Sequence, residues 1–161
     1  MTARVHLLAG LNGAGKTTLA RQLEAELPAV RFSLDEWMLR LYDLRFDDER
    51  YPQLAEKCRE LIWDITAQVV RTGTSVVLDW NMWSRERRAD AVRRATDLGV
   101  ECHLHHVVVP VQVAVQRAAD RRDPGAHRLD ANAVRHLADL FEQPAASEGF
   151  VLHVVRDADR A

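Results

Sequence analysis

The chain has 161 residues, of which 47% are hydrophobic, and a formal net charge of −2. This length fits one domain with a core that needs no disulfide bonds, and the nearly neutral charge excludes a general electrostatic attraction to nucleic acid. The two cysteines, Cys58 and Cys102, belong to no C-x-x-C pair, and no apolar run reaches membrane-spanning length. We therefore expect a single cytoplasmic domain over residues 1–161, with reduced thiols and no signal segment before its first strand.

The first predicted element is a strand over residues 5–9, and the segment after it carries the strongest signal of the chain. Residues 10–17 read GLNGAGKT, which matches the phosphate-binding pattern G-x-x-x-x-G-K-[ST]. Leucines at positions 19, 23 and 27 then predict an amphipathic helix over 18–27 that ends at Pro28. A triphosphate requires this order of strand, glycine loop and helix, because the loop N–H groups and the helix N-terminus attract phosphate.

This loop predicts the contacts of a nucleotide. The ammonium group of Lys16 reaches the β- and γ-phosphates as a mobile charge, and the Thr17 hydroxyl takes a place on Mg²⁺. The complete set of expected nucleotide-binding residues in the loop is Gly10, Asn12, Gly13, Ala14, Gly15, Lys16, Thr17 and Thr18.

Strands and helices alternate along the rest of the chain. We expect a strand over 29–34, a helix over 36–44, an exposed charged loop over 45–51 and a long helix from residue 52 to the glycine at 73. A buried strand over 75–78 follows, then a helix over 85–98 that starts at a serine cap, and a fourth strand over 103–109. A proline opens the next helix at 110, an aspartate caps the last helix at 130, and a fifth strand spans 150–155. This alternation predicts an α/β P-loop NTPase fold, with a five-stranded parallel sheet between helices and a short helical lid.

Two aspartates follow predicted strands, at the edge of the sheet where ligands bind. Asp79 comes after three apolar residues, as the acid of a Walker B strand does, and is expected to hold Mg²⁺; the alternative is a capping or turn aspartate. Asp35 is the candidate general base and acceptor contact, because a hydroxyl that receives a phosphoryl group needs a nearby carboxylate. The alternative for Asp35 is a plain N-cap of the following helix.

Four arginines at 117, 121, 122 and 128 surround an Asp-Pro-Gly turn at 123–125. Cations that close over the transferring group assist phosphoryl transfer, so we expect a lid over about 117–130. Its catalytic arginines are Arg117, Arg121 and Arg122, with Arg117 also contacting the nucleotide. The alternative is a solvated helix face.

Three tryptophans lie just past strand ends, where they can line an acceptor pocket; core packing explains them equally well. These are Trp37, Trp80 and Trp83, and Arg40 and Arg85 are the candidate anchors of an acceptor. The three histidines at 103, 105 and 106 do not favour a metal site, since neighbouring residues of a strand point to opposite faces.

Missing motifs narrow the class of P-loop protein. Neither lysine belongs to an N/T-K-x-D motif, and no L-S-G-G-Q segment occurs, so a guanine-specific GTPase and an ABC ATPase are excluded. The chain resembles the small P-loop kinases of the zeta-toxin and polynucleotide-kinase-like group, among the AAA-type ATP-binding proteins. The resemblance covers nearly the whole chain and rests on GLNGAGKTTLARQL, LDEWMLRLY, VVLDWNMWSRERR and the late HRL…LFEQPAASEGF stretch.

This resemblance implies ATP with Mg²⁺ as donor, Asp35 as the base, Asp79 as the Walker B-like acid and lid arginines as a charge clamp. Polynucleotide kinases place an arginine about three residues after the first of these aspartates, whereas Met38 stands here. We therefore expect a kinase that moves the γ-phosphoryl group of ATP to a hydroxyl of a small-molecule acceptor. A polynucleotide 5′-hydroxyl kinase and a non-kinase ATPase or nucleotide switch that acts through a protein partner stay open. GTP is also an acceptable donor, because no guanine-reading motif enforces a choice.

Overall fold

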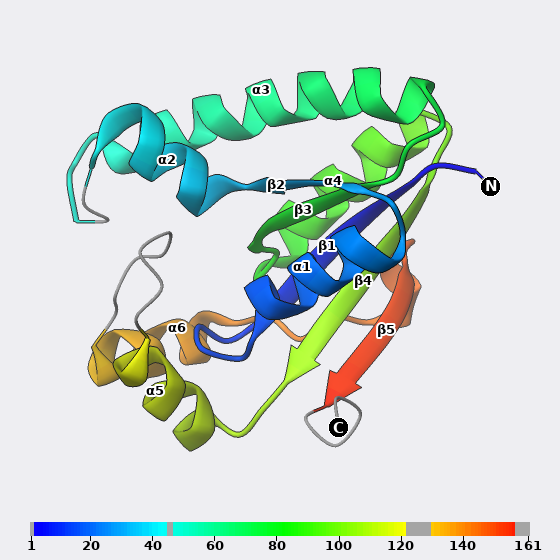
Figure 1. Cartoon of the computed structure of the whole chain (residues 1–161). Helices are drawn as coiled ribbons and strands as arrows, with labels where there is room; N and C mark the ends of the chain where they lie inside the picture. Colours follow the sequence, from blue (N-terminus) through cyan, green and yellow to red (C-terminus); the bar gives the residue numbers. More distant parts are fainter. Residues whose placement is uncertain (1, 45–46, 122–129, 157–161) are drawn as a thin grey trace.

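A five-stranded, all-parallel sheet with the strand order β2-β3-β1-β4-β5 organises the structure, a computed structural model that describes residues 2–44, 47–121 and 130–156. The strands are β1 (Arg4–Gly10), β2 (Val30–Ser33), β3 (Val76–Asn81), β4 (Glu101–Val108) and β5 (Val151–Arg156). The helices are α1 (Lys16–Glu26), α2 (Leu34–Tyr42), α3 (Tyr51–Arg71), α4 (Arg85–Asp97), α5 (Val111–Asp120) and α6 (Ala131–Leu140). The predicted α/β fold is confirmed (Figure 1).

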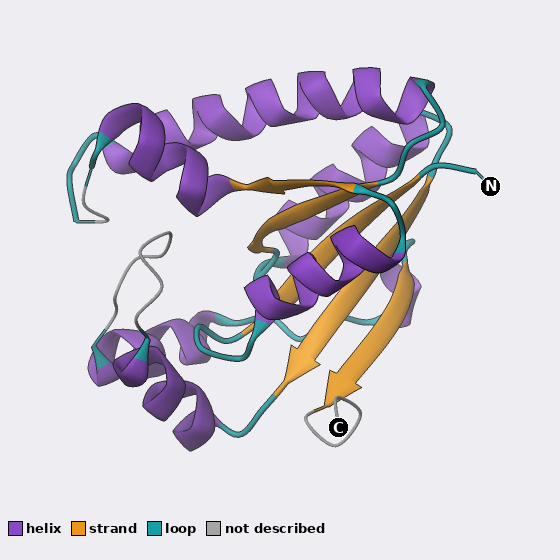
Figure 2. Ribbon diagram, in the orientation of Figure 1, coloured by secondary structure: helices purple, strands orange, loops and turns teal. Residues whose placement is uncertain are grey.

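Helices cover both faces of the sheet, as Figure 2 shows. Side chains of β1 alternate between two cores: Val5 and Leu7 pack with α2, α3 and α4, whereas Leu8 packs with α1. A third apolar cluster lies at the carboxyl edge, where Ala114 of α5 and Val134 of α6 pack with the end of β4 and the P-loop. The carboxyl ends of the parallel strands therefore meet at one edge, beside α5 and α6 (Figure 1).

Most capping predictions are confirmed. The Ser84 hydroxyl accepts a hydrogen bond from the Arg87 N–H, and the Asp130 carboxylate accepts one from the Ala133 N–H. Gly73 follows α3 with a φ of +83°, a conformation that favours glycine. Pro110 is the N-cap of α5 instead of its first residue.

Three boundaries differ from the prediction and affect the site. β3 continues to Asn81, so Asp79 lies within the strand instead of after it, because its backbone still pairs with Ser33 of β2. α2 begins at Leu34, and its N-cap is Ser33, whose hydroxyl accepts from the Glu36 N–H. Asp35 is therefore not the cap of this helix. Tyr51, expected in an exposed loop, is buried and begins α3.

No helix within the described ranges is long and apolar enough to cross a membrane. Residues 45–46 of the predicted charged loop and residues 122–129 of the predicted lid, including Arg122, lie outside the described residues.

Candidate active site

A cleft of about 600 Å³ opens at the carboxyl edge of the sheet. Its walls come from the P-loop, from the starts of α2 and α3, from the end of β3 and the segment after it, and from α5 and α6. The predicted residues that line it are Gly10, Asn12, Gly13, Gly15, Lys16, Thr17, Thr18, Asp35, Asp79, Trp80, Trp83, Arg117 and Arg121. Segments distant in the sequence thus form one concave site, as the rule for ligand positions in α/β sheets predicts.

The P-loop has the backbone that a phosphate cradle requires. Gly13 and Gly15 have φ values of +84° and +98°, and Gly15 is the N-cap of α1. A Cβ atom on Gly13 would lie 2.3 Å from the Ala114 carbonyl oxygen, so only glycine allows α5 to pack against the loop. The loop N–H groups and the start of α1 can then face an anion.

Lys16 lies partly buried above this loop. Its Nζ donates hydrogen bonds to the carbonyl oxygens of Gly10 at 3.0 Å and Leu11 at 2.8 Å. Burial lowers the pKa of Lys16 to about 8; the charge of Arg121 lowers it further, and the carboxylates of Asp79 and Asp35 oppose the shift. The ammonium group is thus held by neutral carbonyls, which phosphate oxygens can replace with a stronger, charge-assisted contact.

Asp79 and Thr17 bring two oxygen ligands together. The Thr17 hydroxyl donates to Asp79 Oδ1 at 3.3 Å, and Asp79 is 6% exposed. Burial raises the pKa of Asp79 and the guanidinium of Arg31 opposes the shift. Oxygen ligands of this kind suit Mg²⁺, and no group of three or more His, Cys, Asp or Glu among the described residues is placed to hold a metal by itself. A magnesium ion here would therefore share its coordination with phosphate oxygens.

Sequence reasoning missed Arg31. Its Nη1 donates to Asp79 Oδ2 at 2.9 Å, and its other nitrogens bind Glu24 of α1 and Glu36 of α2. The side chain can reach Asp79 because β2 lies beside β3 in the sheet. A signal was present, since a charged residue in the middle of the short strand VRFS needs a buried partner.

Asn81 was also missed, because the predicted strand ended at residue 78, whereas β3 continues to Asn81. Its side-chain oxygen accepts a hydrogen bond from the Gly10 N–H at 3.4 Å, which ties the start of the P-loop to β3. Tyr51 was assigned to a loop, yet it lines the cleft, and burial together with the charge of Asp35 raises its pKa.

Among the predicted site residues that the structure describes, four do not line the cleft. Ala14 is fully buried under the loop. Trp37 packs edge-on against Phe32, with ring centroids 6.0 Å apart, so core packing explains this tryptophan. Arg40 is exposed on α2, and Arg85 is exposed at the start of α4, where its backbone N–H donates to Glu142.

A buried arginine fixes the segment that carries Trp80 and Trp83. Arg88 has no exposed surface; its Nη1 donates to the carbonyl oxygens of Met82 at 3.0 Å and Glu142 at 2.9 Å, and its Nε donates to Glu148 at 2.9 Å. The Glu142 N–H in turn donates to the Trp83 carbonyl at 3.0 Å. The segment that carries Trp80 and Trp83 is therefore held in place by Arg88 and Glu142.

The comparisons with known proteins agree with this geometry. A family model described as an AAA domain matches residues 5–144. No sequence among curated proteins matches the chain.

Solved structures share the fold. Chaetomium thermophilum Kti12 in complex with ADP-AlF3 has a TM-score of 0.74 and 18% identity, over 96% of this chain and 90% of that one. A gluconokinase from Sinorhizobium meliloti 1021 has a TM-score of 0.60 and 18% identity, over 96% and 83%. A chain of the Pnkp1/Rnl/Hen1 RNA repair complex has a TM-score of 0.71 and 20% identity, over 86% and 44%. The fold is thus that of P-loop kinase-like domains.

Proposed function

We propose that this chain, which belongs to the AAA domain family, is a phosphotransferase that moves the γ-phosphoryl group of ATP to a hydroxyl of a small molecule. One observation carries the proposal: the cleft extends from the P-loop to a second wall with Asp35, Trp80 and Trp83. A protein that only bound a nucleotide would not need this second, carboxylate-bearing half. The likeness to a gluconokinase structure and to an RNA repair complex supports a kinase, without naming the acceptor.

The donor half fits ATP and Mg²⁺. The glycine cradle and Lys16 would contact the phosphates, and Thr17 and Asp79 are the residues that would hold Mg²⁺. When bound, the ion neutralises charge on the phosphate oxygens. The Arg31 guanidinium holds the second oxygen of Asp79 and so orients the carboxylate.

The acceptor half supplies a base. Asp35 is the second residue of α2, and Ser33, not Asp35, caps the helix. In the proposed reaction Asp35 takes the proton of the acceptor hydroxyl, and the oxygen of that hydroxyl bonds to the γ-phosphorus. The bond from that phosphorus to the β,γ-bridging oxygen breaks, and ADP leaves. Arg117 and Arg121 also line the cleft, and in the proposed reaction they stabilise the charge on the transferring group.

A screen of ATP consumption against sugars, nucleosides, aminoglycosides and DNA 5′-hydroxyls tests this function. Lys16→Ala should lower MgATP affinity and abolish turnover, because it removes the charge that contacts the phosphates. Lys57→Ala is the matched control, since Lys57 is the other lysine of the chain and lies exposed on α3. Equal affinity and turnover for Lys16→Ala and wild type would refute the proposal.

Activity on DNA 5′-hydroxyls alone would favour the polynucleotide alternative. One position argues against that alternative. Polynucleotide kinases place an arginine about three residues after the aspartate that corresponds to Asp35, whereas Met38 stands here and is fully buried in the core.

A further inference from the structure

The lining of the cleft contains two guanidinium groups that the proposed reaction does not use. Arg59 comes from α3 and Arg87 from α4, and both line the cleft together with Trp80 and Trp83. Arg87 is half-buried, and its guanidinium carbon lies 5.6 Å from the centroid of the Trp83 ring. This cation–π contact orients Arg87 without neutralising it.

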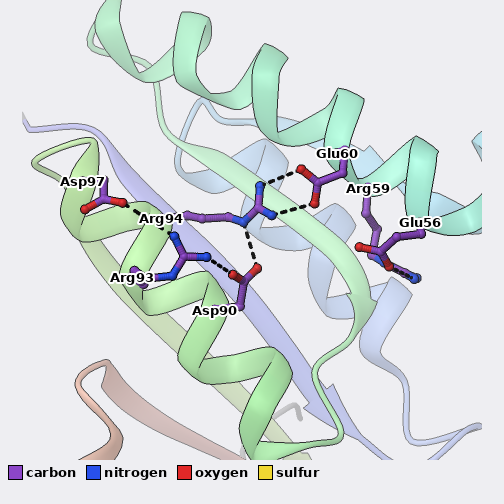
Figure 3. A network of polar contacts seen from close by, with 7 residues as sticks. All are labelled: Glu56, Arg59, Glu60, Asp90, Arg93, Arg94 and Asp97. Carbon is purple, nitrogen blue, oxygen red and sulfur yellow. Dashed lines mark hydrogen bonds and ion pairs between the residues drawn. The ribbon is translucent and has the colours of Figure 1, made fainter.

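A second arginine on the same helix shows what Arg87 lacks. Arg94 lies seven residues further along, about two turns, and therefore on the same face of α4. It also stacks on a tryptophan, with its guanidinium carbon 5.5 Å from the Trp63 ring centroid. In addition it binds both oxygens of Glu60, at 2.6 and 3.1 Å, and Asp90 at 2.8 Å (Figure 3). Arg94 is thus a stacked arginine whose charge is fully paired.

Arg87 has the stack but not the carboxylate. Among the described residues, none places a carboxylate oxygen within 4.0 Å of its guanidinium. The carboxylates of Glu56 and Glu86 act on it only from further away. Burial and the charge of Arg59 lower the pKa of Arg87, which means that its positive charge is not fully compensated.

Arg59 adds to this excess of positive charge. Its side chain is 16% exposed and pairs with Glu56 of the preceding turn, whose side chain is 60% exposed (Figure 3). Because that carboxylate is largely solvated, water screens the pair and limits how far it offsets the charge of Arg59. Two guanidinium groups beside two indole rings form a site that suits a planar or tetrahedral oxyanion.

We propose, on the basis of the proposed function, that the acceptor carries an anionic group, a carboxylate or a phosphate, which binds to Arg87 and Arg59 against Trp83 while its hydroxyl faces Asp35. The anion of the acceptor then contacts Arg87 in the way that Glu60 contacts Arg94. The two ends of the cleft thereby separate two anions: the triphosphate contacts the P-loop, and the acceptor contacts the arginines of α3 and α4.

Matched acceptors test this site through activity. Each set contains a neutral polyol, the corresponding sugar acid and the corresponding sugar phosphate, assayed for ADP release with saturating MgATP. We expect turnover with at least one anionic member and a much higher KM for the neutral one. Arg87→Gln should raise the KM for the anionic acceptor about 10- to 100-fold, the usual effect of losing a charged hydrogen bond, and leave the KM for MgATP unchanged. Arg87→Lys should restore part of the affinity.

Arg93→Gln is the control, because Arg93 is exposed on the same helix, pairs with Asp90 and Asp97, and does not line the cleft (Figure 3). A preference for the neutral polyol, or an unchanged KM in Arg87→Gln, would overturn the proposal.

Binding distinguishes failure of this site from failure of the kinase function. With the P-loop saturated by a non-hydrolysable ATP analogue and Mg²⁺, malonate or inorganic phosphate is titrated while tryptophan fluorescence is followed. Wild type should show a saturable change that Trp83→Phe reduces and Arg87→Gln weakens about 10-fold or more. If no acceptor is phosphorylated but this binding is observed, the anion site stands without the kinase. Equal binding by Arg87→Gln and wild type refutes the anion site, whatever the activity.

Discussion

Four histidines on one face of the sheet make folding sensitive to acid. They are His6 of β1, His103 and His105 of β4, and His153 of β5, with neighbouring ring centroids 4.7–5.3 Å apart. The ring nitrogens pair with one another, His6 with His105 at 3.1 Å and His103 with His153 at 2.9 Å. Each such bond needs one unprotonated nitrogen as acceptor, so at least one ring of each pair must be neutral.

The surroundings keep two of these rings neutral. Burial is the largest cause that lowers the pKa of His6 to about 4 and that of His105 to about 3; neighbouring histidines, and for His6 also Arg4, contribute. A carboxylate also lies beside this cluster in the described part of the chain: Glu101 Oε2 is 3.3 Å from His103 Nε2. The unfolded chain has histidine pKa values near 6.5, so it binds more protons than the folded chain below that pH.

Stability must therefore fall as the pH decreases from about 6.5 towards 4. At pH 5 a histidine of the unfolded chain is protonated, whereas the buried ring of the folded chain stays neutral. The pH then lies about 1.5 units below the pKa of the unfolded histidine. This gap corresponds to about 2 kcal/mol for each of His6 and His105. Because the two rings share a hydrogen bond, we expect a total loss of about 2–4 kcal/mol between pH 7.5 and pH 5.

Urea denaturation at pH 7.5 and pH 5 measures this loss. His105→Leu should reduce the difference in unfolding free energy between the two pH values by about 2 kcal/mol relative to wild type. His136→Gln, a change at an exposed position of α6, should leave that difference as in wild type. Carboxylates titrate alike in all three proteins and cancel in the comparison. The same pH dependence in His105→Leu as in wild type would refute the reasoning.

Three further predictions concern the cleft and the buried arginine behind it. Asp35→Asn should leave MgATP binding nearly intact and reduce acceptor phosphorylation about 10²–10⁴-fold, whereas Asp79→Asn should raise the Mg²⁺ concentration needed for half-maximal rate. Steady-state kinetics and calorimetric binding measure these effects. The reverse pattern would exchange the roles of the two aspartates. Arg88→Met should lower the unfolding free energy by about 3–5 kcal/mol in urea titrations, because Glu148 loses its buried partner, while the exposed Arg93→Gln should cost less than about 1 kcal/mol; equal losses would contradict this account. Arg121→Ala should lower kcat more than it weakens ATP binding, and unchanged turnover would make Arg121 a solvated side chain.

The fold and the donor half of the site could be predicted from local sequence. Strand and helix periodicities, the glycine spacing and capping residues such as Ser84 and Asp130 each act within a few residues. The prediction that His105 and His106 point to opposite faces is confirmed: His105 joins the histidine cluster, and His106 stacks on Phe141.

Contacts between distant segments could not be predicted in the same way. Arg31 reaches Asp79 only because β2 and β3 become neighbours, and Arg88 binds Glu148 across 60 residues of sequence. Arg59 and Arg87 come from helices that read as ordinary charged surfaces. Trp37 shows the opposite error, since a tryptophan after a strand end can pack into the core instead of the cleft.

Product analysis tests the central claim most directly. Phosphorus NMR of a reaction with MgATP and the best acceptor of the screen should show ADP and one new phosphate monoester in equal amounts. Asp35→Asn should form neither product at an appreciable rate while still binding MgATP. ADP with inorganic phosphate and no monoester, for every acceptor, would contradict phosphoryl transfer and make the protein an ATPase.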